Sequence, residues 1–155
     1  MVSNEEISVN KRNGRGKETL QIDKIHSMVG FATEGITGVS ASHVEMNSGI
    51  QFFDGVSTAD IQQILIKSAN DLISLENPNY QYVAARLLLF QLRKQLFHRL
   101  WDHPKFVDHI KSLIDKGLYD KDILVNYDES EIDRMGMWID HERDYNFTYA
   151  GLRQV

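Results

Sequence analysis

The sequence predicts an α+β fold that is mainly helical, with a short N-terminal β-hairpin lying as a lid on a four-helix bundle and further helices after it. Two observations lead to this class. Near the start, apolar and polar residues alternate with the period of a strand on either side of an Asn-Gly pair. From residue 25 onward, apolar residues recur with the period of a helix in one segment after another.

The expected hairpin consists of two short strands. Ile7 and Val9 alternate with polar residues on the first strand, and Leu20 and Ile22 do so on the return strand. The Asn-Gly pair at residues 13–14 between them is a strong hairpin signal. Because two strands this short are only marginally stable alone, we expect the hairpin to pack on helices.

Two helices are expected next. The first begins at a cap formed by Asp23 and ends at Gly35. Its apolar face consists of Ile25, Met28, Val29 and Ala32. A second, weaker helix is expected over residues 42–51, with Val44 and Ile50 turned inward.

The third and fourth helices have the clearest signals. Ser57 with Asp60 three residues later resembles a capping box and predicts the start of a helix. The apolar face of this helix consists of Ile61, Ile64, Leu65, Ala69 and Leu72. A break at Pro78 follows, and residues 82–97 are then apolar on nearly every side, which is typical of a central, buried helix.

Beyond Pro104 the sequence becomes acidic, and we expect further helices. An amphipathic helix with an apolar face of Phe106, Ile110, Leu113 and Ile114 should end at Gly117. Asp128 and Glu131 predict a capping box for another helix, which carries Ile132, Met135 and Ile139. A short helix is expected within residues 145–155. We place a domain boundary near residue 102.

The composition indicates a globular, cytoplasmic protein. The chain is 42% hydrophobic and 25% charged, which is ordinary for this class. It has no apolar run of membrane-spanning length, and its acidic, polar start does not resemble a signal peptide, so we expect no membrane partner. The absence of cysteine excludes disulfides, thiolate metal sites and a cysteine nucleophile.

Positive charge is concentrated in the hairpin, although the whole chain has a net charge of −5. Residues 8–24 contain five basic and two acidic residues, which gives this segment a net charge of +3. A local basic patch on an acidic body suits a small anionic ligand better than nucleic acid, so no nucleic-acid partner is expected. The alternative is a solvated hairpin that binds nothing.

Three basic residues are candidates for binding a triphosphate. Lys11 and Arg12 lie beside the hairpin turn, where glycines let the backbone approach a ligand closely. Lys24 lies in the first turn of the first helix, where backbone N–H groups and the helix dipole favour an anion. The sequence contains neither a Walker A motif nor G-x-G-x-x-G, so the common nucleotide motifs do not support this assignment.

Three other residues have two interpretations each. Phe90 and Lys94 are four residues apart and share a helix face, where a ring and an ammonium group can meet a base and a phosphate. Alternatively, Phe90 belongs to the core and Lys94 complements the C-terminus of its helix. Thr58 either offers its hydroxyl to a ligand or simply begins a helix.

No metal site and no catalytic residue is expected. The chain has six histidines, but His98, His103 and His109 do not fall on one helix face, and a proline interrupts them. No H-x-x-x-H pattern exists. The carboxylates beyond residue 102 are interpreted as solvated helix faces, and no Ser/His/Asp arrangement follows from spacing.

The order of several short motifs is more specific than any one of them. The motifs are Val9-Asn10-Lys11-Arg12-Asn13-Gly14, Ile22-Asp23-Lys24-Ile25-His26, Ala32-Thr33-Glu34-Gly35, Gln51-Phe52-Phe53-Asp54-Gly55, Thr58-Ala59-Asp60-Ile61, Asp71-Leu72-Ile73-Ser74, Pro78-Asn79-Tyr80-Gln81-Tyr82-Val83-Ala84-Ala85-Arg86-Leu87, Ile139-Asp140-His141-Glu142-Arg143-Asp144 and Phe147-Thr148-Tyr149-Ala150. Together they resemble the N-terminal ATP-cone and adjoining helical region of the large (α) subunit of class I, aerobic ribonucleoside-diphosphate reductases. The resemblance covers the chain from about Ile7.

The resemblance implies an allosteric site that binds ATP or dATP, with Mg²⁺ assisting, in an ATP-cone domain of residues 1–102. Residues 103–155 would then be a helical segment leading into a catalytic barrel. In the family's pattern the phosphates meet Lys11, Lys24 and Lys94, and Glu18 helps to hold the base. Other positions of the site are Arg12, Gln21, Ile25, Thr58, Gln62 and Phe90. Gln21 replaces the asparagine of bacterial relatives and Gln62 a usual histidine, which favours weaker discrimination between ATP and dATP.

The resemblance also implies partners: the remainder of the large subunit, the radical-generating small (β) subunit, and further copies in a homo-oligomer. We expect no catalysis by this chain alone, because the barrel and its redox cysteines are missing. The chain would be an excised piece or one part of a divided subunit. Two rivals are a transcriptional regulator, which would normally bring a cysteine-rich zinc ribbon, and a docking domain that has lost its ligand, which Gln21 and Gln62 favour.

Overall fold

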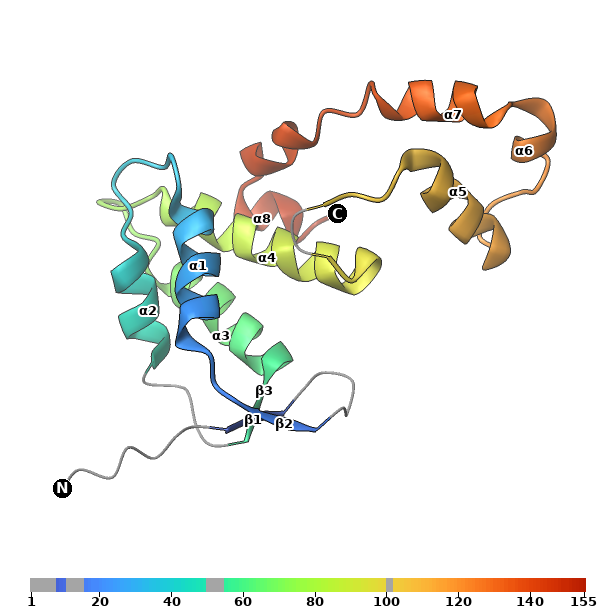
Figure 1. Ribbon diagram of the computed structural model, residues 1–155. Coiled ribbons are helices and arrows are strands. Elements are labelled where there is room, and N and C mark those ends of the chain that lie inside the picture. The colour runs from blue at the N-terminus through green and yellow to red at the C-terminus, as the bar shows by residue number, and fades with distance from the viewer. Residues whose placement is uncertain (1–7, 11–15, 50–54, 100–101) are drawn as a thin grey trace. The chain divides into compact units, whose positions relative to one another are not determined.

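The computed structural model describes residues 8–10, 16–49, 55–99 and 102–155 (Figure 1). They fall into two compact units, Met1–Gln91 with Tyr145–Val155, and Leu92–Asp144. Helices dominate and a small three-stranded sheet accompanies them, which confirms the predicted α+β class. Within the described ranges, no helix has both the length and the apolar character that crossing a membrane requires.

A three-stranded sheet lies at the start of the first unit. β1 (Ser8–Asn10) pairs antiparallel with β2 (Lys17–Thr19), which confirms a hairpin, although neither Leu20 nor Ile22 lies in the return strand. A strand that the sequence did not predict, β3 (Val56–Ser57), pairs parallel with β1 on its other edge. Val9 and Val56 are buried, so the central strand β1 and the edge strand β3 pack on the helices. The predicted turn at 13–14 and Ile7 lie outside the described residues.

The return strand lies earlier in the chain than predicted, and the helix after it also begins earlier. α1 spans Ile22–Thr33, so Ile22 is helical and largely exposed rather than an inward-facing strand residue. Its N-cap is Gln21, not Asp23, which instead lies in the first turn, where the helix dipole favours a carboxylate. The predicted end is confirmed, since Gly35 has a φ of +70°, a conformation that glycine adopts without strain.

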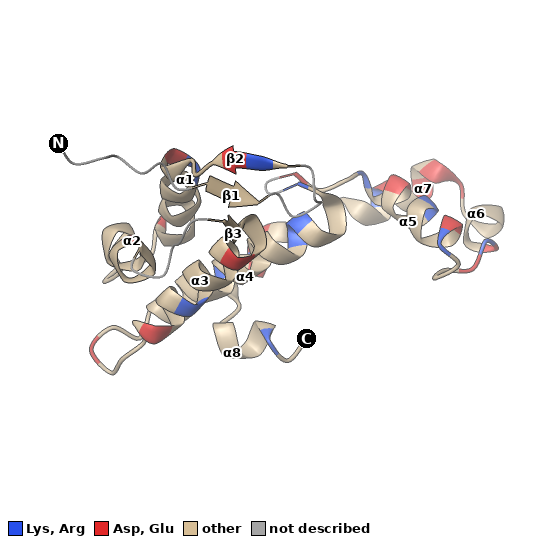
Figure 2. Ribbon diagram, turned by 90° about the horizontal axis from the view of Figure 1, so that it is seen from below, with Lys and Arg blue, Asp and Glu red and all other residues tan. Residues whose placement is uncertain are grey.

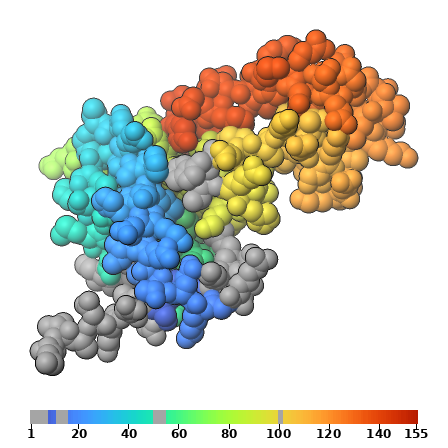
Figure 3. Space-filling model, in the orientation of Figure 1, coloured from blue at the N-terminus to red at the C-terminus, as the bar shows by residue number. Residues whose placement is uncertain are grey.

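α2 (Ala41–Gly49) packs beside α1, and Figure 3 shows the two helices side by side on one face. Val44 is fully buried, as predicted, whereas Ile50 lies outside the described residues. His26 Nδ1 and Glu45 Oε1 lie 2.9 Å apart and form a polar contact between the helices.

The third and fourth helices follow the sequence pattern closely. α3 (Thr58–Asp71) starts at the predicted cap, where Ser57 Oγ accepts a hydrogen bond from the Asp60 N–H. After the break at Pro78, α4 (Tyr80–Phe97) supplies more buried apolar residues to the first unit than any other described element. Its buried apolar residues are Tyr80, Val83, Ala84, Ala85, Leu87, Leu88, Leu89 and Phe90. The expectation of a central, buried helix is therefore confirmed.

A short C-terminal helix, α8 (Tyr149–Leu152), completes the first unit, and Thr148 caps it through a hydrogen bond from the Gly151 N–H. The guanidinium of Arg86 lies 5.2 Å from the centre of the Tyr145 ring and donates to the Glu34 carbonyl at 2.6 Å. Arg86 thus ties α4 to both the end of α1 and the chain before α8.

The second unit contains α5 (Phe106–Asp115), the unpredicted α6 (Ile123–Asn126) and α7 (Glu129–Gly136), and a 3-10 helix, η1 (His141–Asn146), begins at its end. The capping box at Asp128 and the helix end at Gly117 are confirmed. The buried core consists of Val107, Ile110 and Ile132. Met135 and Ile139 are each a little under half exposed, so Ile132 alone of the three apolar residues assigned to this helix is buried.

Candidate functional site

The strands and the N-termini of two helices are joined directly in the first unit. β2 leads into α1 through two residues, and β3 leads into α3 without any intervening residue. Because β1 pairs with both strands, the hairpin lies next to both helix starts. Five of the predicted site residues therefore lie on or beside this sheet: Glu18, Gln21, Lys24, Ile25 and Thr58.

The start of α1 can bind an anion. Gln21 is extended (φ −93°, ψ 93°), and among the described residues its side chain makes no capping hydrogen bond to the helix. Lys24 is exposed in the first turn, and Ile25 beside it is buried and anchors that turn. N–H groups at a helix start that no side chain caps, together with a nearby ammonium group, favour a phosphate.

The start of α3 is less suited to an anion. Ser57 Oγ accepts from the Asp60 N–H at 3.0 Å and donates to Asp60 Oδ2 at 2.6 Å. This cap occupies one of the N–H groups that a phosphate would otherwise use, and it is the feature that distinguishes this helix start from that of α1, since both first turns carry an aspartate. Thr58 is partly exposed next to it, so its hydroxyl suits an uncharged part of a ligand better than a phosphate.

Asn10 fixes the hairpin to the chain before α3, a role that the sequence analysis missed. Its Nδ2 donates to the Gly55 carbonyl at 2.7 Å, and the Gly55 N–H donates to the Ser8 carbonyl at 2.8 Å. Gly55 has a φ of +81°, which favours glycine. Asn10 had looked like one polar residue in an alternating strand, and only its partner 45 residues away shows its function.

α3 and α4 pack closely against each other, partly through side-chain hydrogen bonds. Gln62, which is 5% exposed, donates from Nε2 to the Leu87 carbonyl at 3.0 Å. Gln63 donates from Nε2 to Gln91 Oε1 at 2.9 Å. Phe90 is 1% exposed, so its ring fills the core in this conformation. The geometry therefore favours a packing role for Gln62 and Phe90.

The charges around the sheet are mixed. Lys17 and Lys24 are exposed, whereas Glu18, Asp23 and Asp60 supply negative charge nearby, and Figure 2 shows both signs on β2. Lys11 and Arg12, the hairpin cations of the predicted site, lie outside the described residues. Among the residues that the structure describes, the positive charge that would attract a triphosphate thus comes from Lys17, Lys24 and the α1 start.

The ATP cone domain family matches residues 7–95 of this chain. The chain belongs to this family. Over 149 residues it is 45% identical to the ribonucleoside-diphosphate reductase subunit alpha of Buchnera aphidicola, with 96% of this chain and 19% of the relative covered. It is 43% identical over 152 residues to ribonucleoside-diphosphate reductase 1 subunit alpha of Escherichia coli, and 40% identical over 149 residues to the corresponding subunit of Enterobacteria phage T4.

These relatives confirm the resemblance drawn from the motifs. The E. coli alignment covers 98% of this chain and 20% of the relative, and the T4 alignment 96% and 19%. The chain thus spans about a fifth of the length of the curated relatives it matches. The matched ATP cone ends within α4, so α5, α6 and α7 of the second unit lie outside it.

The matched ATP cone contains every predicted site residue, from Lys11 to Lys94. Lys94 is one turn after Phe90 on α4, with an exposed side chain, and it belongs to the second compact unit. Its place in the site stays a prediction, as do the contacts predicted for Glu18 and Phe90.

Proposed function

We propose that this ATP cone binds an adenine nucleotide, ATP or dATP with Mg²⁺, as an allosteric effector. The observation that supports this most is the start of α1, which no side chain caps in the described structure and which carries the exposed Lys24 beside the sheet. The phosphates would accept hydrogen bonds from the first-turn N–H groups and from the Lys24 ammonium group. Charge-assisted contacts of this kind contribute about 1.5–3 kcal/mol each.

Calorimetric titration of the chain with ATP and with dATP, each with Mg²⁺, tests this proposal. We expect saturable binding that Lys24→Ala weakens at least tenfold, since about 1.4 kcal/mol corresponds to a factor of ten. Lys67→Ala is a matched control, because Lys67 is an exposed lysine on α3 that pairs with Asp71 in the next turn. Equal weakening by both variants would contradict a specific phosphate site at α1.

The regulatory output would concern ribonucleotide reduction, because the relatives are reductase alpha subunits. We propose that nucleotide binding shifts the packing of hairpin and helices, and that this changes a surface for the remainder of the large subunit or for the small subunit. The cytoplasmic location and the homo-oligomer expected from the sequence belong to the same proposal. Light scattering of the assembled enzyme with and without dATP measures this output, and an unchanged mass would contradict it.

A second candidate is a docking domain without a nucleotide. It is favoured by the hydrogen bond that commits Gln62 to the Leu87 carbonyl and by the burial of Phe90. Thermal unfolding distinguishes the two, because a ligand at 100 times its Kd adds about 2.7 kcal/mol of stability. No shift with either nucleotide at millimolar concentration would support the docking domain.

A further inference from the structure

Three side chains that commonly bind metals lie together in the second unit. One donor atom each from His103, His141 and Asp144 can be chosen so that all lie within 4.8 Å of one another. His141 and Asp144 come from η1, where three residues make one turn, so residues three apart lie on the same side of the helix. His103 comes from the segment just before α5, 38 residues earlier in the chain.

The two imidazoles face each other. Their ring centres lie 3.5 Å apart with an angle of 6° between the planes, and His141 Nδ1 lies 3.8 Å from Asp144 Oδ2. Donor atoms on a tetrahedral ion with bonds of about 2.0–2.1 Å lie roughly 3.4 Å apart, so only small movements are needed. The lone pairs of parallel rings do not converge, and one ring must turn for both to reach an ion. Little is lost by this turn, because aromatic rings prefer offset or edge contacts to face-to-face stacking.

A buried cation holds the carboxylate in place. Arg93, whose side chain is 4% exposed, donates from an Nη to Asp144 Oδ2 at 3.0 Å. An outer hydrogen bond of this kind fixes the orientation of a metal ligand. Exposed carboxylates beside the two histidines, Asp102, Asp140 and Glu142, offset the positive charge of Arg93.

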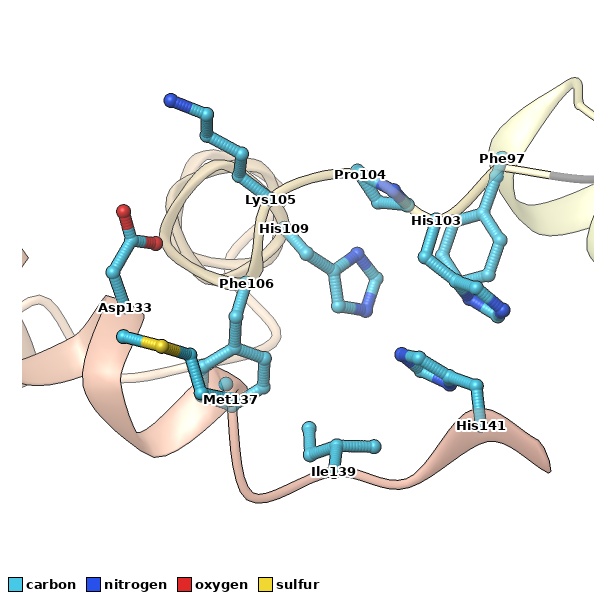
Figure 4. A pocket seen from close by; sticks show the side chains of 11 residues that line it. Phe97, His103, Pro104, Lys105, Phe106, His109, Asp133, Met137, Ile139 and His141 are labelled. Atoms are coloured by element: carbon cyan, nitrogen blue, oxygen red, sulfur yellow. The ribbon is translucent and has the colours of Figure 1, made fainter. Parts of the chain in front are cut away.

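The histidines open onto a pocket of about 400 Å³. Figure 4 shows His103, His109 and Phe97 on one side of it and His141 on the other. The Phe97 ring makes edge contacts with His103 and His109, at centre distances of 5.9 and 5.3 Å. Burial, and then the charges of Arg93 and His141, hold the pKa of His103 below its usual value, which favours the neutral imidazole that binds metals.

We infer that His103, His141 and Asp144 bind one divalent transition-metal ion, of which Zn²⁺ is the best match, with water from the pocket completing its coordination. Two imidazoles and one carboxylate favour this class over Mg²⁺ or Ca²⁺, which prefer oxygen ligands alone. The ion would join the segment before α5 to the segment after α7. It would thus cross-link the two ends of a unit whose buried core is small. Because a metal that closes a long loop stabilises the fold, we expect the ion to stabilise this unit.

Titration of the tag-free chain with Zn²⁺ alone, followed by calorimetry, tests the site. We expect one equivalent to bind, and His103→Gln and His141→Gln each to weaken binding at least tenfold. His109→Gln is the matched control, because His109 lines the same pocket but lies outside the donor cluster. Failure of the intact chain to bind below millimolar Zn²⁺, or equal binding by all three variants, would overturn the inference.

A measurement on the intact chain covers the case in which a variant does not fold. Histidine ring signals in NMR spectra report on each imidazole separately. With one equivalent of Zn²⁺, the signals of His103 and His141 should move, whereas those of His26 and His43, which belong to the first unit, should not. Movement confined to His26 or His43 would assign the ion to another place and overturn the inference.

Discussion

Gly136, the last residue of α7, lies very close to Phe106, the first residue of α5. A Cβ added at this position would lie 2.5 Å from Phe106 Cβ and 3.1 Å from Phe106 Cγ. Carbon atoms in ordinary contact lie about 3.5–4.0 Å apart, so the new methyl group would overlap the first atom by at least about 1 Å. Because Phe106 Cβ is attached directly to the backbone of α5, a rotamer change cannot remove the overlap, and α5 and α7 must move apart.

Gly136→Ala should therefore destabilise the second unit by about 1–3 kcal/mol, the usual cost of overpacking. Gly30→Ala adds the same methyl group inside α1, where nothing lies within 4 Å of the new atom. It should stabilise the first unit by about 0.5–1 kcal/mol, because alanine loses less conformational entropy than glycine in a helix. The same glycine-to-alanine substitution should therefore lower the free energy of unfolding at Gly136 and raise it at Gly30.

Urea unfolding measures both changes, with far-UV circular dichroism for the helices and tryptophan fluorescence for the second unit, which contains Trp138. The unfolding midpoint should fall for Gly136→Ala and rise for Gly30→Ala at an unchanged m-value. A midpoint for Gly136→Ala equal to or above that of the unmodified chain would refute the close packing of α5 on α7.

Three further predictions concern the core, a buried polar group and a helix cap. Leu87→Ala should cost about 2–5 kcal/mol in the free energy of unfolding, because Leu87 is fully buried, whereas the exposed Leu96→Ala should change it by less than about 0.5 kcal/mol. Gln62→Met keeps the volume but removes the hydrogen bond to the Leu87 carbonyl, so urea unfolding should show a loss of about 0.5–1.5 kcal/mol. The hydroxyl of Ser130, and then the Glu131 N–H, lower the pKa of Asp128, so its stabilising effect is complete above the ordinary carboxyl pKa and is lost as the pH falls through the lowered value. Asp128→Asn should reduce the difference in unfolding midpoint between pH 7 and pH 3, and an unchanged difference would contradict this role.

The parts of the fold that could be predicted from the sequence depend on interactions within a few residues. The caps at Ser57 and Asp128 and the helix end at Gly35 are of this kind, because each involves a side chain or a glycine and its own turn. Asp23 was assigned wrongly as a cap for a related reason. A carboxylate is favourable anywhere in the first turn, so its presence does not determine at which residue the helix begins.

The parts that could not be predicted depend on partners distant in the chain. β3 has only two residues, and Asn10 acquires its role from a carbonyl 45 residues away. Sequence spacing also could not show the difference between the two helix starts: the Ser57 side chain caps the start of α3, whereas no side chain caps the start of α1 in the described structure. That difference is what places the expected phosphate at α1, so the candidate site follows from the structure of the two helix starts rather than from the lysines alone.

The histidine cluster could not be found from the histidine spacing in the sequence. The absence of H-x-x-x-H excludes two histidines one turn apart on an α-helix, but η1 is a 3-10 helix, in which a spacing of three gives the same alignment. His141 and Asp144 satisfy that spacing, and the third donor, His103, lies just before α5, which packs against α7, the helix that precedes the other two donors. Gly136→Ala, which should separate these helices, is therefore also expected to weaken Zn²⁺ binding although it removes no ligand. Unchanged Zn²⁺ affinity in that variant would show that the cluster does not depend on the packing of α5 on α7.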